Sequence, residues 1–144
     1  MDVFFENNVR KCFDFLVREH GFSTPIFYTV AYELHVAYIK NDFFVDIAFD
    51  GSYWATVNKS EKVVQGIISG KTKINDLDYR KIASHSLLRL DTKKEVYNSI
   101  LKFYRNEKAL FYYAVLLKNN PEILNGNFRK FSLVYLLLKK IGIK

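Results

Sequence analysis

The 144-residue sequence contains little of what builds loop-rich or cross-linked proteins. Only 2 prolines and 6 glycines are present, which excludes a collagen-like or loop-dominated chain. A single cysteine, Cys12, rules out a disulfide within the chain and fits a reducing compartment. Because free cysteines are usually buried, we expect Cys12 to act as a small apolar side chain.

Long apolar runs are also missing. No stretch reaches the roughly 18 apolar residues of a membrane-spanning helix, and the nearest, Phe131 to Leu138, is flanked by Lys130 and Lys139. The first residues, MDVFFENNVRKC, include early acids and lack the apolar stretch of a signal peptide. These absences predict a cytoplasmic protein.

Aromatic side chains, in contrast, are abundant. They make up 17% of the residues within a hydrophobic share of 49%, which excludes a disordered chain. The length suits one domain with a real core, and no repeat or linker divides the chain. We therefore expect a single domain over residues 1–144.

Charge is distributed unevenly along the sequence. Residues 1–79 carry 8 Lys and Arg against 11 Asp and Glu, whereas residues 80–144 carry 14 against 4, and the net charge is +7. The basic C-terminal half could meet a nucleic acid, an acidic partner or the acidic half of its own chain.

Hydrophobic periodicity predicts that the chain begins with a helix. Residues Asp2 to His20 repeat apolar side chains at spacings of three and four, with Asp2 as N-cap and Gly21 as the left-handed residue after the helix. Residues Phe22 to Val30 form a connection or an edge strand, because Pro25 cannot donate to a central ladder.

A three-stranded antiparallel meander should follow. Apolar and polar residues alternate over Tyr32 to Val57, with turns at Asn41-Asp42 and at residues 50–52. The first turn sets a register whose apolar pairs are Tyr38 with Val45, Val36 with Ile47, and Leu34 with Phe49. The first helix and one C-terminal helix should cover this apolar face.

Residues Lys59 to Leu90 are the least regular part of the sequence. The apolar piece Val63 to Ile68 suits a strand or a helix, Lys71 to Asp78 is polar, and Tyr79 to Leu90 predicts a short helix.

Helical periodicity returns after Asp91. A long helix capped there should end near Asn119-Asn120, and a last helix from Phe128 to Ile141 should follow an Asn127 cap. The predicted fold is α+β, with an N-terminal helix, a three- to four-stranded antiparallel meander and C-terminal helices packed on the sheet.

Two sequence features have some likeness to chemical motifs. Residues 66–72, GIISGKT, have three residues between their glycines where a phosphate-binding loop needs four, so Gly70 is expected to be a turn glycine. The histidines, His20, His35 and His85, have no second ligand at a metal-binding spacing. We therefore expect no enzyme, no metal and no cofactor.

One group of polar side chains falls on the sheet face opposite the apolar one, namely Glu33, His35, Asp46, Trp54 and Thr56. The first register sets Glu33 opposite Asp50, and a three-residue loop at 50–52 sets Asp46 opposite Thr56. Like charges directly across a ladder are unfavourable unless a cation lies nearby. Three interpretations remain open. The basic C-terminal half could fold over this face, the face could be a binding surface anchored by Trp54, or a carboxylate–histidine group could do acid–base chemistry.

The long C-terminal helix mixes basic residues with tyrosines. Such mixtures can bind single-stranded nucleic acid through phosphate contacts and stacking, although half-buried tyrosines with hydroxyls in water are the alternative. No helix-turn-helix, RNA-recognition or KH signature is present. The basic residues concerned are Lys94, Lys102, Arg105 and Lys108.

Three segments carry a resemblance to a known group of proteins. They are FDFLVREHGF at residues 13–22, the strand–turn–strand pattern from Val36 to Phe49, and NPEILNGNFRKF at residues 120–131. Together they resemble small bacterial proteins similar to the immunity proteins of polymorphic toxin systems. The resemblance implies a non-catalytic protein that binds a cognate toxin domain directly, and it carries over no site residue.

The predicted function is therefore a cytoplasmic immunity-type protein that neutralises a toxin domain through a preformed surface. The alternative is a nucleic-acid-associated protein that uses the four basic residues of the long helix, and no membrane contact is expected. The predicted partner contacts are Trp54, Glu33, His35 and Asp46.

Overall fold

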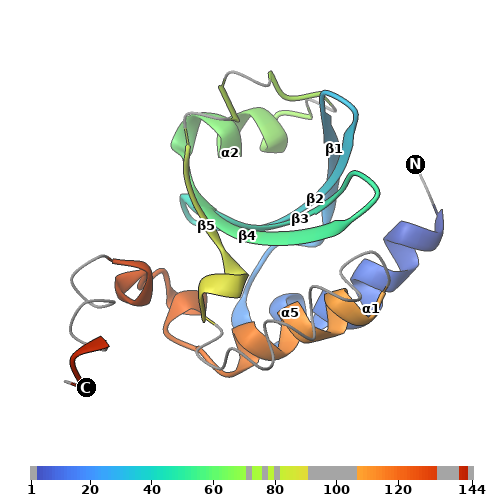
Figure 1. The fold of residues 1–144 in the computed structure, drawn as a ribbon. Helices are drawn as coiled ribbons and strands as arrows, with labels where there is room; N and C mark the ends of the chain where they lie inside the picture. The colour runs from blue at the N-terminus through green and yellow to red at the C-terminus, as the bar shows by residue number, and fades with distance from the viewer. Residues whose placement is uncertain are drawn as a thin grey trace.

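The structure is a computed structural model that describes residues 3–70, 73–75, 78–79, 82–90, 107–132 and 140–142. These residues make an α+β fold around one antiparallel sheet, with strand order β1-β2-β3-β4-β5 (Figure 1). The helices and strands, in chain order, are α1 (Val3–His20), β1 (Ile26–Val30), β2 (Glu33–Lys40), β3 (Phe43–Phe49), β4 (Tyr53–Lys59), α2 (Glu61–Ile68), β5 (Ala83–Ser86) and α5 (Lys108–Lys118). Three 3₁₀ turns accompany them, η1 (Leu87–Leu90), η2 (Ile123–Asn125) and η3 (Arg129–Phe131).

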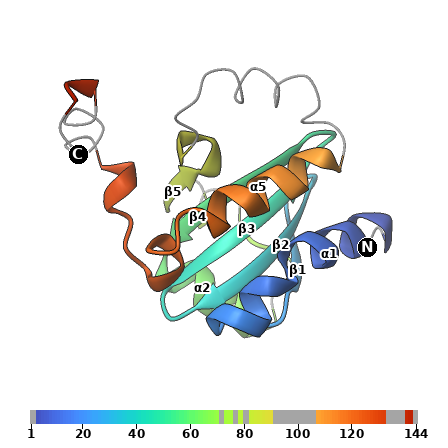
Figure 2. The same ribbon diagram turned by 90° about the horizontal axis from the view of Figure 1, so that it is seen from below.

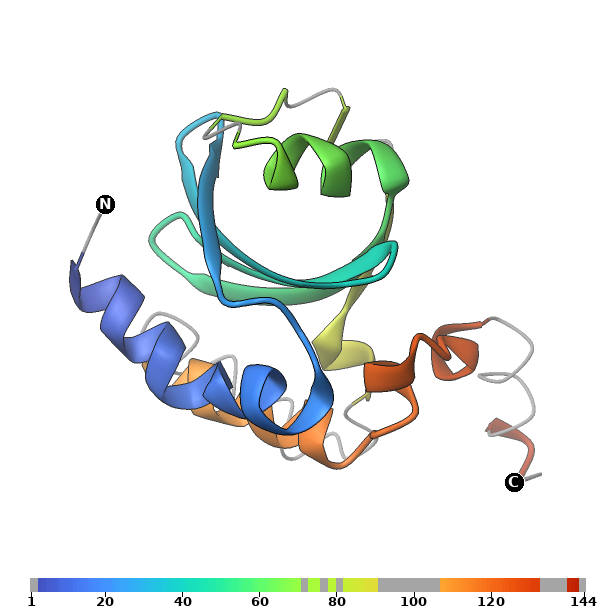
Figure 3. The same ribbon diagram turned by 180° about the vertical axis from the view of Figure 1, so that it is seen from behind.

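The sheet is curved, and helices lie on both of its faces. α1 and α5 lie side by side across the convex face (Figures 1 and 2). The sheet curls around α2, which occupies the concave side (Figure 3). The prediction that the first helix and a C-terminal helix cover one face of the meander is confirmed, and α2 adds a cover for the other.

The convex face is the apolar face predicted from the sequence. Its register is the predicted one, with Val36 opposite Ile47 between β2 and β3. Both side chains are fully buried, together with Phe13 and Leu16 of α1, whereas Phe49 is only partly buried. α1 ends as predicted, because Gly21 adopts φ +74°.

The concave face has a second, smaller core. Val63, Val64 and Ile67 of α2 are buried against Phe44 and Ile39 of the sheet. The ambiguous piece Val63 to Ile68 is therefore helical. The Ser60 hydroxyl accepts a hydrogen bond from the N–H of Val63 at 3.2 Å and caps the first turn.

In the described part of the chain, the sheet has five strands instead of the three to four predicted. Of the two alternatives predicted for Phe22 to Val30, the structure has the edge strand, β1. The short helix predicted over Tyr79 to Leu90 is wrong, because residues 83–86 form β5 against β4 and η1 follows. The backbone N–H and C=O groups on the outer side of β4 would have no partners without β5, and pairing with β5 satisfies them.

The C-terminal region differs in part from its prediction. α5 ends at Lys118, before Asn119, as expected, whereas the predicted cap at Asp91 lies outside the described residues. The continuous helix predicted from Phe128 to Ile141 is wrong at its start, since Ser132 is extended. The Phe131 carbonyl, which a continuing helix would use, accepts instead from Arg89 Nη2 at 3.3 Å.

Within the described ranges, no helix is both long and apolar enough to cross a membrane.

Candidate functional site

The predicted polar side chains lie on the concave face of the sheet. β-Pairing sets Tyr28 of β1, His35 of β2, Ala48 of β3 and Trp54 of β4 in one row across four strands. Asp46 lies in the next row, opposite Thr56 as predicted. Strand alternation places these side chains on one face, because residues two apart point the same way.

Asp46 is the centre of a buried hydrogen-bond cluster. Its Oδ1 accepts from the Tyr28 hydroxyl at 2.5 Å, and its Oδ2 accepts from the Tyr79 hydroxyl at 2.5 Å. Oδ2 also lies 2.7 Å from His35 Nδ1. Because an ionised carboxylate only accepts hydrogen bonds, Nδ1 is the protonated nitrogen. We call these four residues the Asp46 cluster.

The cluster changes the acidity of its members. Burial first, and then the charge of Asp46, raises the pKa of Tyr28 and of Tyr79 well above the ordinary tyrosine value. Both phenols therefore stay protonated and donate to the carboxylate. Burial alone lowers the pKa of His35, but Asp46, Glu33 and Asp50 outweigh it, so that the pKa is raised.

The cluster is closed to large molecules. The side chains of His35 and Asp46 are each 1% exposed, because α2 and Tyr79 cover this part of the sheet. The prediction that His35 and Asp46 contact a partner directly therefore needs correction, since neither side chain reaches the surface. Of the basic C-terminal half, α5 packs on the convex face, whereas residues 91–106 and 133–139 lie outside the described residues.

Glu33 and Trp54, the other two predicted contacts, lie toward the end of the concave face. The Glu33 side chain is 38% exposed and Trp54 is partly buried. The β1–β2 and β3–β4 turns both lie at this end of the sheet, since Leu34 and Phe49 are the last pair of their ladder. Tyr32 and Asp50 in these turns are exposed. We call Tyr32, Glu33, Asp50 and Trp54 the turn edge.

A strained backbone position lies next to the turn edge, in the β1–β2 turn. Ala31 adopts φ +52°, a left-handed conformation that costs a residue with a Cβ about 1–2 kcal/mol. The sequence alternation predicted that Tyr32 begins the apolar face of a strand, but β2 begins at Glu33 and Tyr32 is fully exposed in the turn. Strain of this kind is often kept where a loop serves a function.

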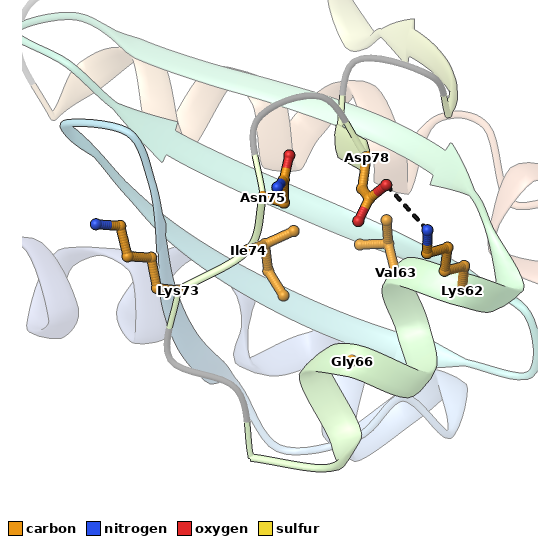
Figure 4. A pocket seen from close by; sticks show the side chains of 7 residues that line it. All are labelled: Lys62, Val63, Gly66, Lys73, Ile74, Asn75 and Asp78. Atoms are coloured by element: carbon orange, nitrogen blue, oxygen red, sulfur yellow. Dashed lines mark hydrogen bonds and ion pairs between the residues drawn. The ribbon is translucent and has the colours of Figure 1, made fainter.

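A separate pocket of about 210 Å³ lies beside α2 (Figure 4). Lys62 in its wall is paired with Asp78 at 3.0 Å, and Lys73 extends away from the other labelled side chains. Gly66 of the GIISGKT segment is inside α2, and Gly70 follows the helix with φ +92°. Residues 66–70 thus form the end of a helix, and Gly70 has the predicted turn role.

The remaining predicted site residues are distributed as follows. Lys94, Lys102 and Arg105 lie outside the described residues, and Lys108 is exposed at the start of α5. In the part of the chain that the structure describes, no group of three or more His, Cys, Asp or Glu side chains could hold a metal ion.

Two members of the Asp46 cluster were missed by sequence reasoning. Tyr28 could have been found, because a two-residue turn at residues 31–32 sets it opposite His35. Tyr79 had no comparable signal. It lies beyond α2 in the chain, so its distance from Asp46 depends on how the chain returns over the sheet.

Comparisons with family models, with curated proteins and with solved structures give no match to this chain. The candidate site is therefore interpreted from its own geometry.

Proposed function

We propose that this chain is a non-catalytic protein-binding module of the immunity type, which binds a bacterial toxin domain at the turn edge and so blocks it. The observation that carries the proposal is the exposure of Tyr32 at the end of the sheet that also bears Glu33, Asp50 and Trp54. Aromatic side chains are enriched among binding hot spots, since they bury a large rigid area at small entropic cost. The resemblance of three sequence segments to immunity proteins supports the same class.

The state of the reactive groups also favours binding over catalysis. The His35 and Asp46 side chains are buried, and the Asp46 oxygens already accept three hydrogen bonds. A general base must reach the proton that it takes from a substrate. The cluster instead ties β1, β2 and β3 to Tyr79 and gives the turn edge a rigid support, which lowers the entropic cost of binding.

The partner assay uses the product of the reading frame next to the gene, produced together with this chain. We expect that the neighbouring product alone inhibits the growth of the producing cells, that this chain restores growth, and that the two proteins form a complex. Tyr32→Ala and Trp54→Ala should each weaken the complex by about 2 kcal/mol or more in calorimetry. Phe111→Ala is the matched control, because Phe111 is an exposed aromatic on α5, on the other side of the sheet.

Stability is measured on the same variants by urea unfolding. If Trp54→Ala destabilises the fold and leaves the affinity for the toxin domain unchanged, the turn edge is not the contact surface. If the neighbouring product neither binds nor inhibits growth, the immunity function itself is refuted.

A further inference from the structure

The two acids of the turn edge have only one cation near them among the residues that the structure describes. Glu33 and Asp50 pair with no lysine or arginine there. His35 lies beneath them, with Nε2 at 4.0 Å from Glu33 Oε2. This buried nitrogen makes no hydrogen bond to the described part of the chain. The imidazole is thus held by Asp46 on one side and faces Glu33 on the other.

We propose that the turn edge receives an arginine or lysine side chain of its protein partner, and that this contact competes with the protonation of His35. The inference rests on the proposed function, because it concerns the same four residues. Trp54 lies on the same sheet face as Glu33, and Tyr32 directly precedes Glu33 in the exposed β1–β2 turn. Aromatic faces attract cations. The site therefore offers a cation both carboxylates and π-faces.

Some of the groups around His35 are covered, and others can be reached by a partner. Tyr28 from β1 and Tyr79 lie with ring centroids at 4.9 and 5.1 Å from the imidazole, and Asp46 from β3 holds Nδ1. These groups are covered. Glu33 and Asp50 are the acids on the open side, so a partner cation interacts with them and repels the proton on His35.

The sign of the pH dependence follows from linkage. A cation bound near His35 disfavours the imidazolium, so binding releases a proton and affinity rises as pH passes through the pKa of His35. Charges about 4 Å apart near a protein surface interact strongly enough to change an equilibrium about fivefold or more. We expect a fivefold to tenfold gain in affinity from about pH 6 to about pH 8.

The probe is a tetra-arginine peptide with blocked ends, followed by tryptophan fluorescence. Trp54 is the only tryptophan in the chain, so its emission reports on the turn edge alone. Binding should weaken about fivefold or more in Glu33→Gln. The matched control is Glu19→Gln, because Glu19 is an exposed acid of α1 on the convex side.

A second measurement needs no peptide. The chain has 3 histidines, and NMR can follow the His35 imidazole as pH changes. Glu33→Gln should lower the pKa of His35, whereas Glu19→Gln should leave it unchanged. If Glu33→Gln leaves both the His35 titration and peptide binding unchanged, the proposed coupling is wrong.

These outcomes are separable from those of the proposed function. A toxin domain that binds through Trp54 with no pH dependence and no competition from the peptide would keep the immunity function and overturn this inference. Loss of toxin binding together with intact, pH-dependent peptide binding would refute the immunity function but leave the cation site.

Discussion

Asp46→Asn is the change that tests the buried cluster most directly, because it removes the charge and almost nothing else. In the wild type, three hydrogen bonds reach one carboxylate at 2.5, 2.5 and 2.7 Å. Hydrogen bonds to charged groups contribute about 1 kcal/mol more than neutral ones. An amide at position 46 can keep three hydrogen bonds, but each loses the extra contribution of the charge. We therefore expect the free energy of unfolding to fall by about 3 kcal/mol.

The loss of stability in Asp46→Asn should become smaller as pH rises. The pKa of His35 is raised in the folded state above its unfolded value, mainly because Asp46 outweighs burial. Such a group stabilises the fold fully below its unfolded pKa, about 6.5, and the contribution disappears as pH rises through the folded pKa. The difference between wild type and Asp46→Asn should therefore be largest near pH 6 and narrow toward pH 9.

The assay is urea unfolding of both proteins at several pH values, with Asp42→Asn as control. Asp42 is an exposed acid whose Oδ2 lies 3.6 Å from Lys59 Nζ, and surface pairs of this kind contribute about 0–1 kcal/mol. An Asp46→Asn variant as stable as wild type near pH 6 would refute the cluster as described. A loss that is equal at all pH values would refute the ion pair with His35.

Ile47→Ala should cost about 2–5 kcal/mol in urea unfolding, because Ile47 is fully buried in the core of the convex face, and an unchanged midpoint would contradict the register. Ala31→Gly should leave stability unchanged or raise it by up to about 1 kcal/mol in thermal unfolding, since glycine tolerates φ +52°, and a clear loss would argue against strain. Nucleic-acid binding by the basic half should be weak, blind to sequence and lost between about 50 and 200 mM salt, whereas tight binding of one oligonucleotide at physiological salt would favour the alternative function.

Local patterns determined much of the fold. The periodicity of residues 2–20 predicted α1, and the alternation with a two-residue turn at Asn41-Asp42 predicted the β2–β3 register that the structure has. These features are set by neighbours in sequence, because turn geometry and side-chain alternation act over a few residues. The three-residue loop at 50–52 likewise predicted the β3–β4 pair of Asp46 with Thr56.

Other elements depended on contacts between distant parts of the chain. β5 has little strand pattern of its own and is fixed by pairing with β4. Ser132 is extended because Arg89 takes the Phe131 carbonyl and His85 stacks on the Phe131 ring, with centroids 4.7 Å apart. Such contacts between distant residues override local helix propensity.

The candidate site divides in the same way. The sequence by itself determined that Glu33, His35, Asp46 and Trp54 share one sheet face, because the period of two and the turn lengths leave no other arrangement. Only the tertiary structure decided that α2 and Tyr79 cover His35 and Asp46 while Glu33 stays at the surface. The physical reason is that the burial of a side chain depends on which distant segment packs on its face of the sheet. Both faces carry apolar residues, and local sequence does not specify which helix covers which face.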